Sequence, residues 1–145
     1  MRVLVQRCTY AKVTVDNKIT GQIDSGLMLL VGFTHTDTLD NIKYMVDKVI
    51  NLRIFDDENG VMNKSLLDVS GSILSVSQFT LYADSSKGRR PSYINALSGS
   101  VATELYDKFN ELLREKDIHV ETGIFGADMQ VELVNDGPIT IMLEK

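Results

Sequence analysis

The side chains that most often act as catalytic bases and nucleophiles are sparse in this sequence. It has two histidines, His35 and His119, and a single cysteine, Cys8. No G-x-S-x-G elbow, H-E-x-x-H motif or phosphate-binding P-loop is present. Isolated histidines are more often structural or surface residues than catalytic bases, and a cysteine that alternates with strand residues is usually an inert core thiol. The sequence therefore indicates that the chemistry lies elsewhere.

Two polar segments are better candidates for a site. Ser77-Gln78-Phe79-Thr80-Leu81 ends a strand that begins apolar, and sites are commonly built at strand ends and in the loops that follow them. Asn135-Asp136-Gly137-Pro138-Ile139-Thr140 contains a Gly-Pro pair, which in isolation indicates a turn into an edge strand. Neither segment holds a histidine, lysine or glutamate that could serve as a general base. Thr80 needs such a base to be a nucleophile, so a structural or hydrogen-bonding role is favoured for its hydroxyl.

Length and composition narrow the class of protein. The chain has 145 residues, 43% of them hydrophobic, which is enough for one domain with its own core over residues 1–145. One cysteine and two histidines exclude a disulfide framework and leave little for a metal site. No apolar run approaches the roughly 20 residues of a membrane span, and the first residues do not form a signal peptide. We therefore expect a cytoplasmic protein with no membrane partner.

The charge balance bears on the partner. There are 15 basic and 20 acidic residues, and the net charge of −5 disfavours a partner held through many phosphates. This net charge is still compatible with a protein that binds only the end of an RNA. In the polar loop around residues 83–93, Lys87, Arg89 and Arg90 either contact phosphates or simply face solvent. The acidic loop at 56–60 does not fit an EF-hand, which would need a carboxylate where Phe55 stands, and its Asn-Gly pair predicts a hairpin turn.

Hydrophobic patterning predicts the strands that position the two polar segments. Alternating and β-branched residues indicate a strand at 3–8 and a hairpin over 10–24, and the apolar run 27–33 fits a strand covered on both faces. Further strands are expected at 53–55, 61–62, 72–79, 128–134 and 138–144. The last two are expected to be joined by a link at 135–138.

Helical spacing of apolar residues appears twice. It predicts one helix over 37–52 with Asp37 as its N-cap, and a second over about 101–116 with Ser100 as its cap. About eight short strands and two long helices together predict an α/β fold, a single layered domain with mixed β-sheets.

The whole chain resembles the D-aminoacyl-tRNA deacylases, homodimeric proofreading enzymes also called D-tyrosyl-tRNA deacylases. The resemblance rests mainly on two intact signatures, S-Q-F-T-L at 77–81 and N-D-G-P-x-T at 135–140. Shorter matching segments are spread over the chain, at 5–7, 11–15, 53–55, 62–63, 90–92 and 126–131. Phe79 separates the chain from a related subfamily that has alanine at this position.

This resemblance implies an enzyme that hydrolyses the ester between a D-amino acid, or glycine, and the terminal ribose of tRNA, without a metal or other cofactor. In the family a cis Gly-Pro peptide enters the active site of the partner subunit, where its carbonyl oxygens take the substrate's amino group and leave no room for an L side chain. Gly137 and Pro138 are therefore expected to be the chiral filter, and Arg7 to help fix their loop. Rejection by a steric wall is physically reasonable, because a favourable contact alone rarely discriminates enough.

The resemblance also assigns the rest of the site. Backbone N–H groups around Gln78, Phe79 and Thr80 are expected to hold the ester carbonyl, and Ser77 to contact the substrate. Two further residues, Phe125 and Met129, are expected to line the pocket of the terminal adenosine. Positioning plus backbone oxyanion donors suffices for an ester, with the 2′-hydroxyl of the tRNA activating water or assisting directly, as proposed for the family.

Two other classes of function stay open at this point. One is a non-catalytic nucleic-acid-binding module on the same fold, against which the acidic composition counts. The other is a structural dimer without a ligand.

Overall fold

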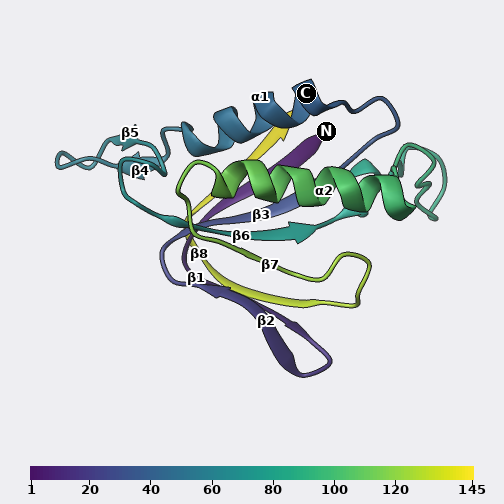
Figure 1. Ribbon diagram of the computed structural model, residues 1–145, viewed down its shortest axis with the longest axis horizontal. Coiled ribbons are helices and arrows are strands. Elements are labelled where there is room, and N and C mark those ends of the chain that lie inside the picture. The colour runs from purple at the N-terminus through teal and green to yellow at the C-terminus, as the bar shows by residue number, and fades with distance from the viewer.

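The computed structural model describes residues 1–145 and consists of a six-stranded sheet with two helices on one of its faces (Figure 1). A second sheet contains only two short strands. The strands of the main sheet are β1 (Arg2–Val15), β2 (Lys18–Ile23), β3 (Gly26–Gly32), β6 (Ser72–Ser77), β7 (Val120–Thr122) and β8 (Gln130–Glu144). The remaining elements are α1 (Leu39–Ile50), β4 (Phe55–Asp56), β5 (Met62–Lys64), the 3₁₀ helix η1 (Phe79–Tyr82) and α2 (Gly99–Arg114).

The order of the strands brings the ends of two parallel strands together. The main path is β2-β1-β3-β6-β7, and β8 pairs with β1 along most of its length. β3 pairs with β6 in parallel, and so does β6 with β7, whereas β1 is antiparallel to its three neighbours. The carboxyl ends of β3 and β6 therefore meet at one edge of the sheet, and in open α/β sheets this edge is where ligands bind.

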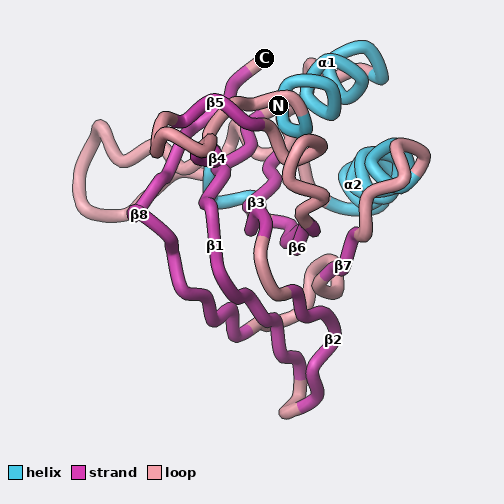
Figure 2. The backbone as a smooth tube through the Cα atoms, turned by 90° about the vertical axis from the view of Figure 1, so that its left-hand side faces the viewer, coloured by secondary structure: helices cyan, strands magenta, loops and turns pink.

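The larger core lies between the helices and the sheet. α1 and α2 lie next to each other over the same face, as the two views show (Figures 1 and 2). Met45 of α1 and Phe109 and Leu113 of α2 are completely buried against apolar residues of β1, β3 and β6. Neither helix has the length and apolar character that crossing a membrane would require. A smaller cluster contains Cys8, Ala11, Val13, Ile23, Met28, Leu74 and Val76.

The predicted fold class is confirmed, with two long helices, eight strands and mixed pairing. The strand boundaries differ in several places. β1 is one continuous strand through the two predicted ones, and it turns into β2 at Asp16 and Asn17, both with positive φ as in a type I′ hairpin. The strand expected at 72–79 ends at Ser77, where the chain enters η1. The short strand β7 was not predicted.

The predicted strands at 128–134 and 138–144 are one strand, so the link at 135–138 is not a reversing turn. Both halves of β8 pair antiparallel with β1, so the chain keeps its direction through this segment. Between Gln6 and Cys8 the chain of β1 advances by two residues, while their partners on β8, Thr140 and Asn135, are five residues apart. Residues 136–139 therefore form a bulge opposite Arg7, which we call the Gly-Pro bulge.

Both predicted helix caps are wrong. Thr38, not Asp37, is the N-cap of α1, and its N–H donates to Asn41 Oδ1 at 2.9 Å. Ser98, not Ser100, precedes the first residue of α2. The reason at α1 is that the carboxylate of Asp37 is used by a partner remote in sequence.

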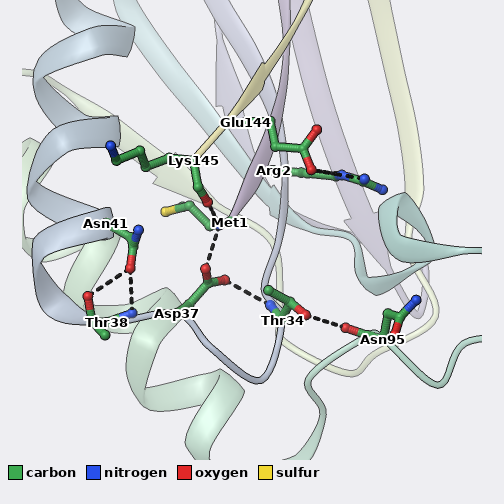
Figure 3. Close-up of polar contacts among 9 residues, drawn as sticks. All are labelled: Met1, Arg2, Thr34, Asp37, Thr38, Asn41, Asn95, Glu144 and Lys145. Atoms are coloured by element: carbon green, nitrogen blue, oxygen red, sulfur yellow. Dashed lines mark hydrogen bonds and ion pairs between the residues drawn. The ribbon is translucent and has the colours of Figure 1, made fainter.

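That partner is the amino group of Met1, and the resulting cluster holds both chain termini (Figure 3). The Met1 ammonium lies 2.5 Å from Asp37 Oδ1 and also donates to the carbonyl of Lys145, while Asp37 Oδ2 accepts the N–H of Thr34 at 2.8 Å. The hydroxyl of Thr34 in turn donates to Asn95 O at 2.6 Å. We call Met1, Thr34, Asp37 and Asn95 the terminal clamp, and it fixes the segment that follows β3.

Candidate active site

A cavity of about 430 Å³ lies at the edge where β3 and β6 end. Its walls come from the ends of these strands, the start of α2 and the loop between β7 and β8. A pocket of this size, mostly apolar with a few polar groups, is typical of small-molecule sites. Its lining includes Gly32, Ser77, Gln78, Phe79, Phe125, Ala127 and Met129.

The first signature forms one wall of the cavity and contains free backbone donors. The N–H of Gln78 donates to Val31 O at 2.7 Å and so continues the parallel ladder. The N–H groups of Phe79 and Thr80 open η1 and make no backbone hydrogen bond, as expected for the first turn of a helix. Of the three expected oxyanion donors, Gln78 is therefore already engaged, and Phe79 and Thr80 are available.

The hydroxyl of Thr80 is paired with an amide. Gln78 Nε2 donates to Thr80 Oγ1 across the start of η1. An amide cannot take a proton from a hydroxyl, so this contact orients Thr80 without activating it. The geometry therefore favours a hydrogen-bonding role over that of a nucleophile.

Aromatic and thioether side chains form the apolar walls. The ring of Phe125 lies 5.8 Å from that of Tyr106, which α2 contributes from the core. Met129 lies over Gly123, where a β-carbon would stand 2.4 Å from its sulfur. At the rim, Phe79 is 51% exposed and makes an edge-on contact with Tyr93 at 5.2 Å between centroids. These surfaces suit a planar ligand group.

The second signature lies away from this cavity within the chain. Gly137 and Pro138 form the tip of the Gly-Pro bulge, both are exposed, and neither lines the cavity. The peptide bond between them is cis, as the resemblance implies. Gly137 has φ +111°, and a β-carbon there would lie 2.9 Å from Ile139 N, so no other residue fits without displacement.

Arg7 fixes the base of the bulge. Its guanidinium is buried and donates to Ile54 O at 2.7 Å. It lies 2.9 Å from Asp136 Oδ2 and 3.5 Å from Asp56 Oδ1, although its Nε–H does not point directly at an acceptor. The positive charge of Arg7, on β1, thus attracts one carboxylate of the bulge and one of the β4–β5 hairpin.

The chain therefore divides the nine expected site residues into two groups. Ser77, Gln78, Phe79, Phe125 and Met129 line the cavity, with Thr80 bonded to Gln78 beside it. The other group consists of Arg7, Gly137 and Pro138, at the bulge.

Sequence reasoning missed two sets of residues around the site. The terminal clamp lies next to the cavity wall in the chain: Phe33 precedes Thr34, Leu97 lies two residues after Asn95, and these two neighbours line the cavity and are joined by the hydrogen bond from Leu97 N to Phe33 O at 2.9 Å. Nothing in the local sequence around Asp37 signals a contact with Met1. Asn135 and Thr140 lie within the second signature, but the sequence assigned neither of them a role of its own.

The remaining candidates from the sequence stand apart from the cavity. Burial raises the pKa of the Cys8 thiol to about 11. His35 contacts Ile94 O at 3.0 Å, and His119 contacts Glu121 at 3.1 Å, both at the surface. Lys87, Arg89 and Arg90 are exposed and form no ion pair within the chain. No three His, Cys, Asp or Glu residues come together in a way that could hold a metal ion.

A cavity at the carboxyl edge of parallel strands, with the unpaired N–H groups of Phe79 and Thr80 at the end of one of them, is typical of α/β proteins that bind small ligands. The family model described as D-Tyr-tRNA(Tyr) deacylase matches residues 4–144. The chain belongs to this deacylase family and is therefore an enzyme of the hydrolase class.

Relatives of known sequence carry the family's name, and solved structures share the fold. A D-aminoacyl-tRNA deacylase of Bacillus velezensis is 58% identical over 144 residues, 99% of this chain and 98% of the relative. One of Fervidobacterium nodosum is 56% identical over 144 residues, 99% of this chain and 97% of the relative. The solved c-Myc DNA unwinding element binding protein is 41% identical with a TM-score of 0.94, covering 100% and 99% of the two chains. A probable eukaryotic D-amino acid tRNA deacylase, 22% identical over 98% and 97% of the chains with a TM-score of 0.82, shares the fold.

Proposed function

We propose that this protein hydrolyses the ester between a D-amino acid, or mischarged glycine, and the terminal ribose of tRNA in the cytoplasm. Relatives at up to 58% identity over nearly the whole chain carry the name D-aminoacyl-tRNA deacylase. The observation that carries the proposal is the pair of free N–H groups of Phe79 and Thr80 beside a cavity with apolar walls. Such donors suit an ester carbonyl on which negative charge develops.

The mechanism relies on positioning. The N–H groups of Phe79 and Thr80 stabilise the oxyanion of the tetrahedral intermediate, and Gln78 orients the Thr80 hydroxyl. Phe125 and Met129 pack against the terminal adenosine, and Ser77 borders the same space. Because none of these groups is a strong base, the 2′-hydroxyl of the substrate assists the attack of water, and no metal or other cofactor takes part.

Chirality is selected by a second copy of the chain. Gly137 and Pro138 protrude from β8 and do not reach their own cavity, so they act as a filter only in the cavity of a partner. β8 pairs with β1 alone, which leaves its other edge open, and it exposes the apolar Val134 and Met142. A twofold dimer would cover this edge and insert both bulges reciprocally.

The exposed basic loop suits the RNA. Lys87, Arg89 and Arg90 have no acidic partner in the chain and are free to contact phosphates near the acceptor end. Because the net charge is −5, we propose that the contact is confined to this loop.

Hydrolysis of matched D- and L-tyrosyl-tRNA tests the function directly. We expect the D ester to be cleaved and the L ester to survive. The same substrates ending in 2′-deoxyadenosine should be cleaved much more slowly, because the assisting hydroxyl is missing. Equal cleavage of D and L esters would contradict the filter, and cleavage of neither would contradict the enzyme.

A second candidate function is binding of nucleic acid without turnover. The solved structure at 41% identity is named as a DNA unwinding element binding protein, which is the observation in its favour. An affinity for duplex DNA that falls steeply with salt, in a preparation that does not cleave D-tyrosyl-tRNA, would support it.

A further inference from the structure

The Gly-Pro bulge is held by a set of amide and hydroxyl contacts centred on Asn135. Asn135 Nδ2 donates to Arg7 O at 2.9 Å and to Ile139 O at 3.0 Å. Its Oδ1 accepts from Gln6 Nε2 at 3.1 Å and from Thr140 Oγ1 at 3.0 Å. Both donors and both acceptor positions of one amide are therefore used.

These contacts join the two ends of the bulge to each other and to β1. Asn135 is the last paired residue before the bulge, and Thr140 is the first one after it. Through Asn135, the carbonyl of Ile139 on the far side is tied to the carbonyl of Arg7 on β1. Gln6 closes the set, because its amide also lies 3.3 Å from Thr140 Oγ1.

The same set reaches the peptide group that matters for selectivity. The single hydroxyl proton of Thr140 is shared between Asn135 Oδ1, at 3.0 Å, and Pro138 O, at 3.3 Å, one of the two carbonyls at the exposed tip. A threonine at this position thus limits the direction in which Pro138 O points, while Arg7 holds the opposite side of the bulge through Asp136. A steric filter depends on such placement, because a small displacement of a positioning group has a large effect on the rate.

We propose that Asn135, Thr140 and Gln6 are positioning residues that set the D/L selectivity of the deacylase by fixing the direction of the Gly137 and Pro138 carbonyls. This inference rests on the proposed function. It assigns the selectivity to hydrogen bonds made by side chains at the base of the bulge, in addition to the shape of its tip. These residues touch no reacting atom, so their effect should fall on discrimination.

The test compares kcat/KM for D- and L-tyrosyl-tRNA in Thr140→Val, Thr140→Ser and Asn135→Asp. Valine has the shape of threonine without the hydroxyl, and we expect the D/L ratio to fall about tenfold, as for the loss of one hydrogen bond. Serine keeps the hydroxyl and should keep the ratio. Aspartate turns two donors into acceptors that face carbonyl oxygens, so it should lower the ratio further.

Thr20→Val is the matched control. The hydroxyl of Thr20 also approaches a backbone carbonyl, Val13 O at 3.5 Å, but on β2, away from the bulge. We expect this variant to keep the D/L ratio of the unchanged protein. Thermal unfolding of each variant reports whether the fold is intact. If Asn135→Asp does not fold, the comparison of Thr140→Val with Thr140→Ser still tests the inference.

The possible outcomes distinguish a failure of this inference from a failure of the proposed function. A lower D/L ratio in Thr140→Val, with Thr140→Ser and Thr20→Val unaffected, supports the inference. If the unchanged protein prefers the D ester and Thr140→Val keeps that preference, or loses activity on both esters equally, only the inference is overturned. If the unchanged protein cleaves neither ester or both alike, the proposed function fails and the inference with it.

Discussion

At Cys8, burial determines the chemistry of the only thiol. The residue lies in β1 with 1% of its surface exposed, within the smaller core cluster. Burial raises its pKa to about 11, since a thiolate would have to form without water around it. The thiolate is the reactive form, so the side chain behaves as a small apolar residue.

We predict that Cys8 does not react with thiol reagents in the folded protein at pH 8. At that pH, three units below the pKa, only about one thiol in a thousand is ionised. Ellman's reagent should therefore label less than a few per cent of the protein in the time that suffices for complete labelling in urea. The urea sample is the control, and rapid labelling of the native protein would show that Cys8 is accessible.

At the scale of elements, the terminal clamp connects segments that are far apart in the sequence. The Met1 ammonium and the Asp37 carboxylate are 0% and 2% exposed. Asp37 connects β1 to the segment before α1, and through Thr34 and Asn95 to the loop before α2 (Figure 3). A buried ion pair adds little net free energy when both partners are present, but removing one leaves the other charge uncompensated.

We predict that Asp37→Asn lowers the free energy of unfolding by about 3 kcal/mol, the usual cost of leaving one buried charge without its partner. Urea unfolding measures the loss. Asp40→Asn is the control, since Asp40 also belongs to the start of α1 but is exposed, and its effect should be much smaller. Equal effects of the two variants would mean that the clamp does not stabilise the fold.

Features that depend on local residue patterns could be predicted from the sequence, whereas features that depend on contacts between distant residues could not. α1, α2 and β3 could be predicted, because their apolar residues have a period that local geometry sets. The cap at Asp37 could not, because the competing partner is 36 residues away. β8 was divided in two because Gly137-Pro138 indicates a turn locally, whereas pairing with β1 on both sides keeps the strand in line.

The site was only partly predictable for the same reason. The two signatures identified the segments that contain the N–H donors and the bulge. The sequence did not show that Gln78 N–H is committed to Val31 O, since strand register is a tertiary property. It also did not show that Asn135 uses every hydrogen-bonding position, because its partners come from β1 and from beyond the bulge.

For the whole molecule, net charge bears on how RNA would be bound under the proposed function. The chain carries a net charge of −5, yet the loop with Lys87, Arg89 and Arg90 is exposed and unpaired. The proposed contact through this loop would involve only a few phosphates, in contrast to the many contacts of a general nucleic-acid-binding domain.

We predict that the double variant Arg89→Ala and Arg90→Ala binds tRNA more weakly and with a smaller salt dependence. Each lost phosphate contact lowers the slope of log K against log salt by about 1. Titration of uncharged tRNA over a range of salt concentrations measures this slope. A double variant of Lys43 and Lys48, exposed on α1, removes the same charge and should leave the slope unchanged. Equal slopes for all three proteins would place the phosphate contacts elsewhere.

Under the proposed twofold dimer, the position of the Gly-Pro bulge predicts that each site is shared between two subunits. Gly137→Ala disturbs the bulge, because a β-carbon there would lie 2.9 Å from Ile139 N. Ala127→Phe fills the cavity, which Ala127 lines. We expect each variant alone to have little selective deacylase activity. In a mixed dimer, the cavity of the Gly137→Ala chain faces the intact bulge of the Ala127→Phe chain, so one complete site is present.

Co-expression of the two chains with different tags isolates this mixed dimer. The tags belong at the carboxyl terminus, because the amino group of Met1 is buried. We expect the mixed dimer to cleave D-tyrosyl-tRNA at about half the rate of the unchanged protein, since one of two sites is intact. If each site were built from a single chain, every site in the mixture would carry one defect. Activity would then remain at the level of the separate variants, and the bulge would have to act within its own chain.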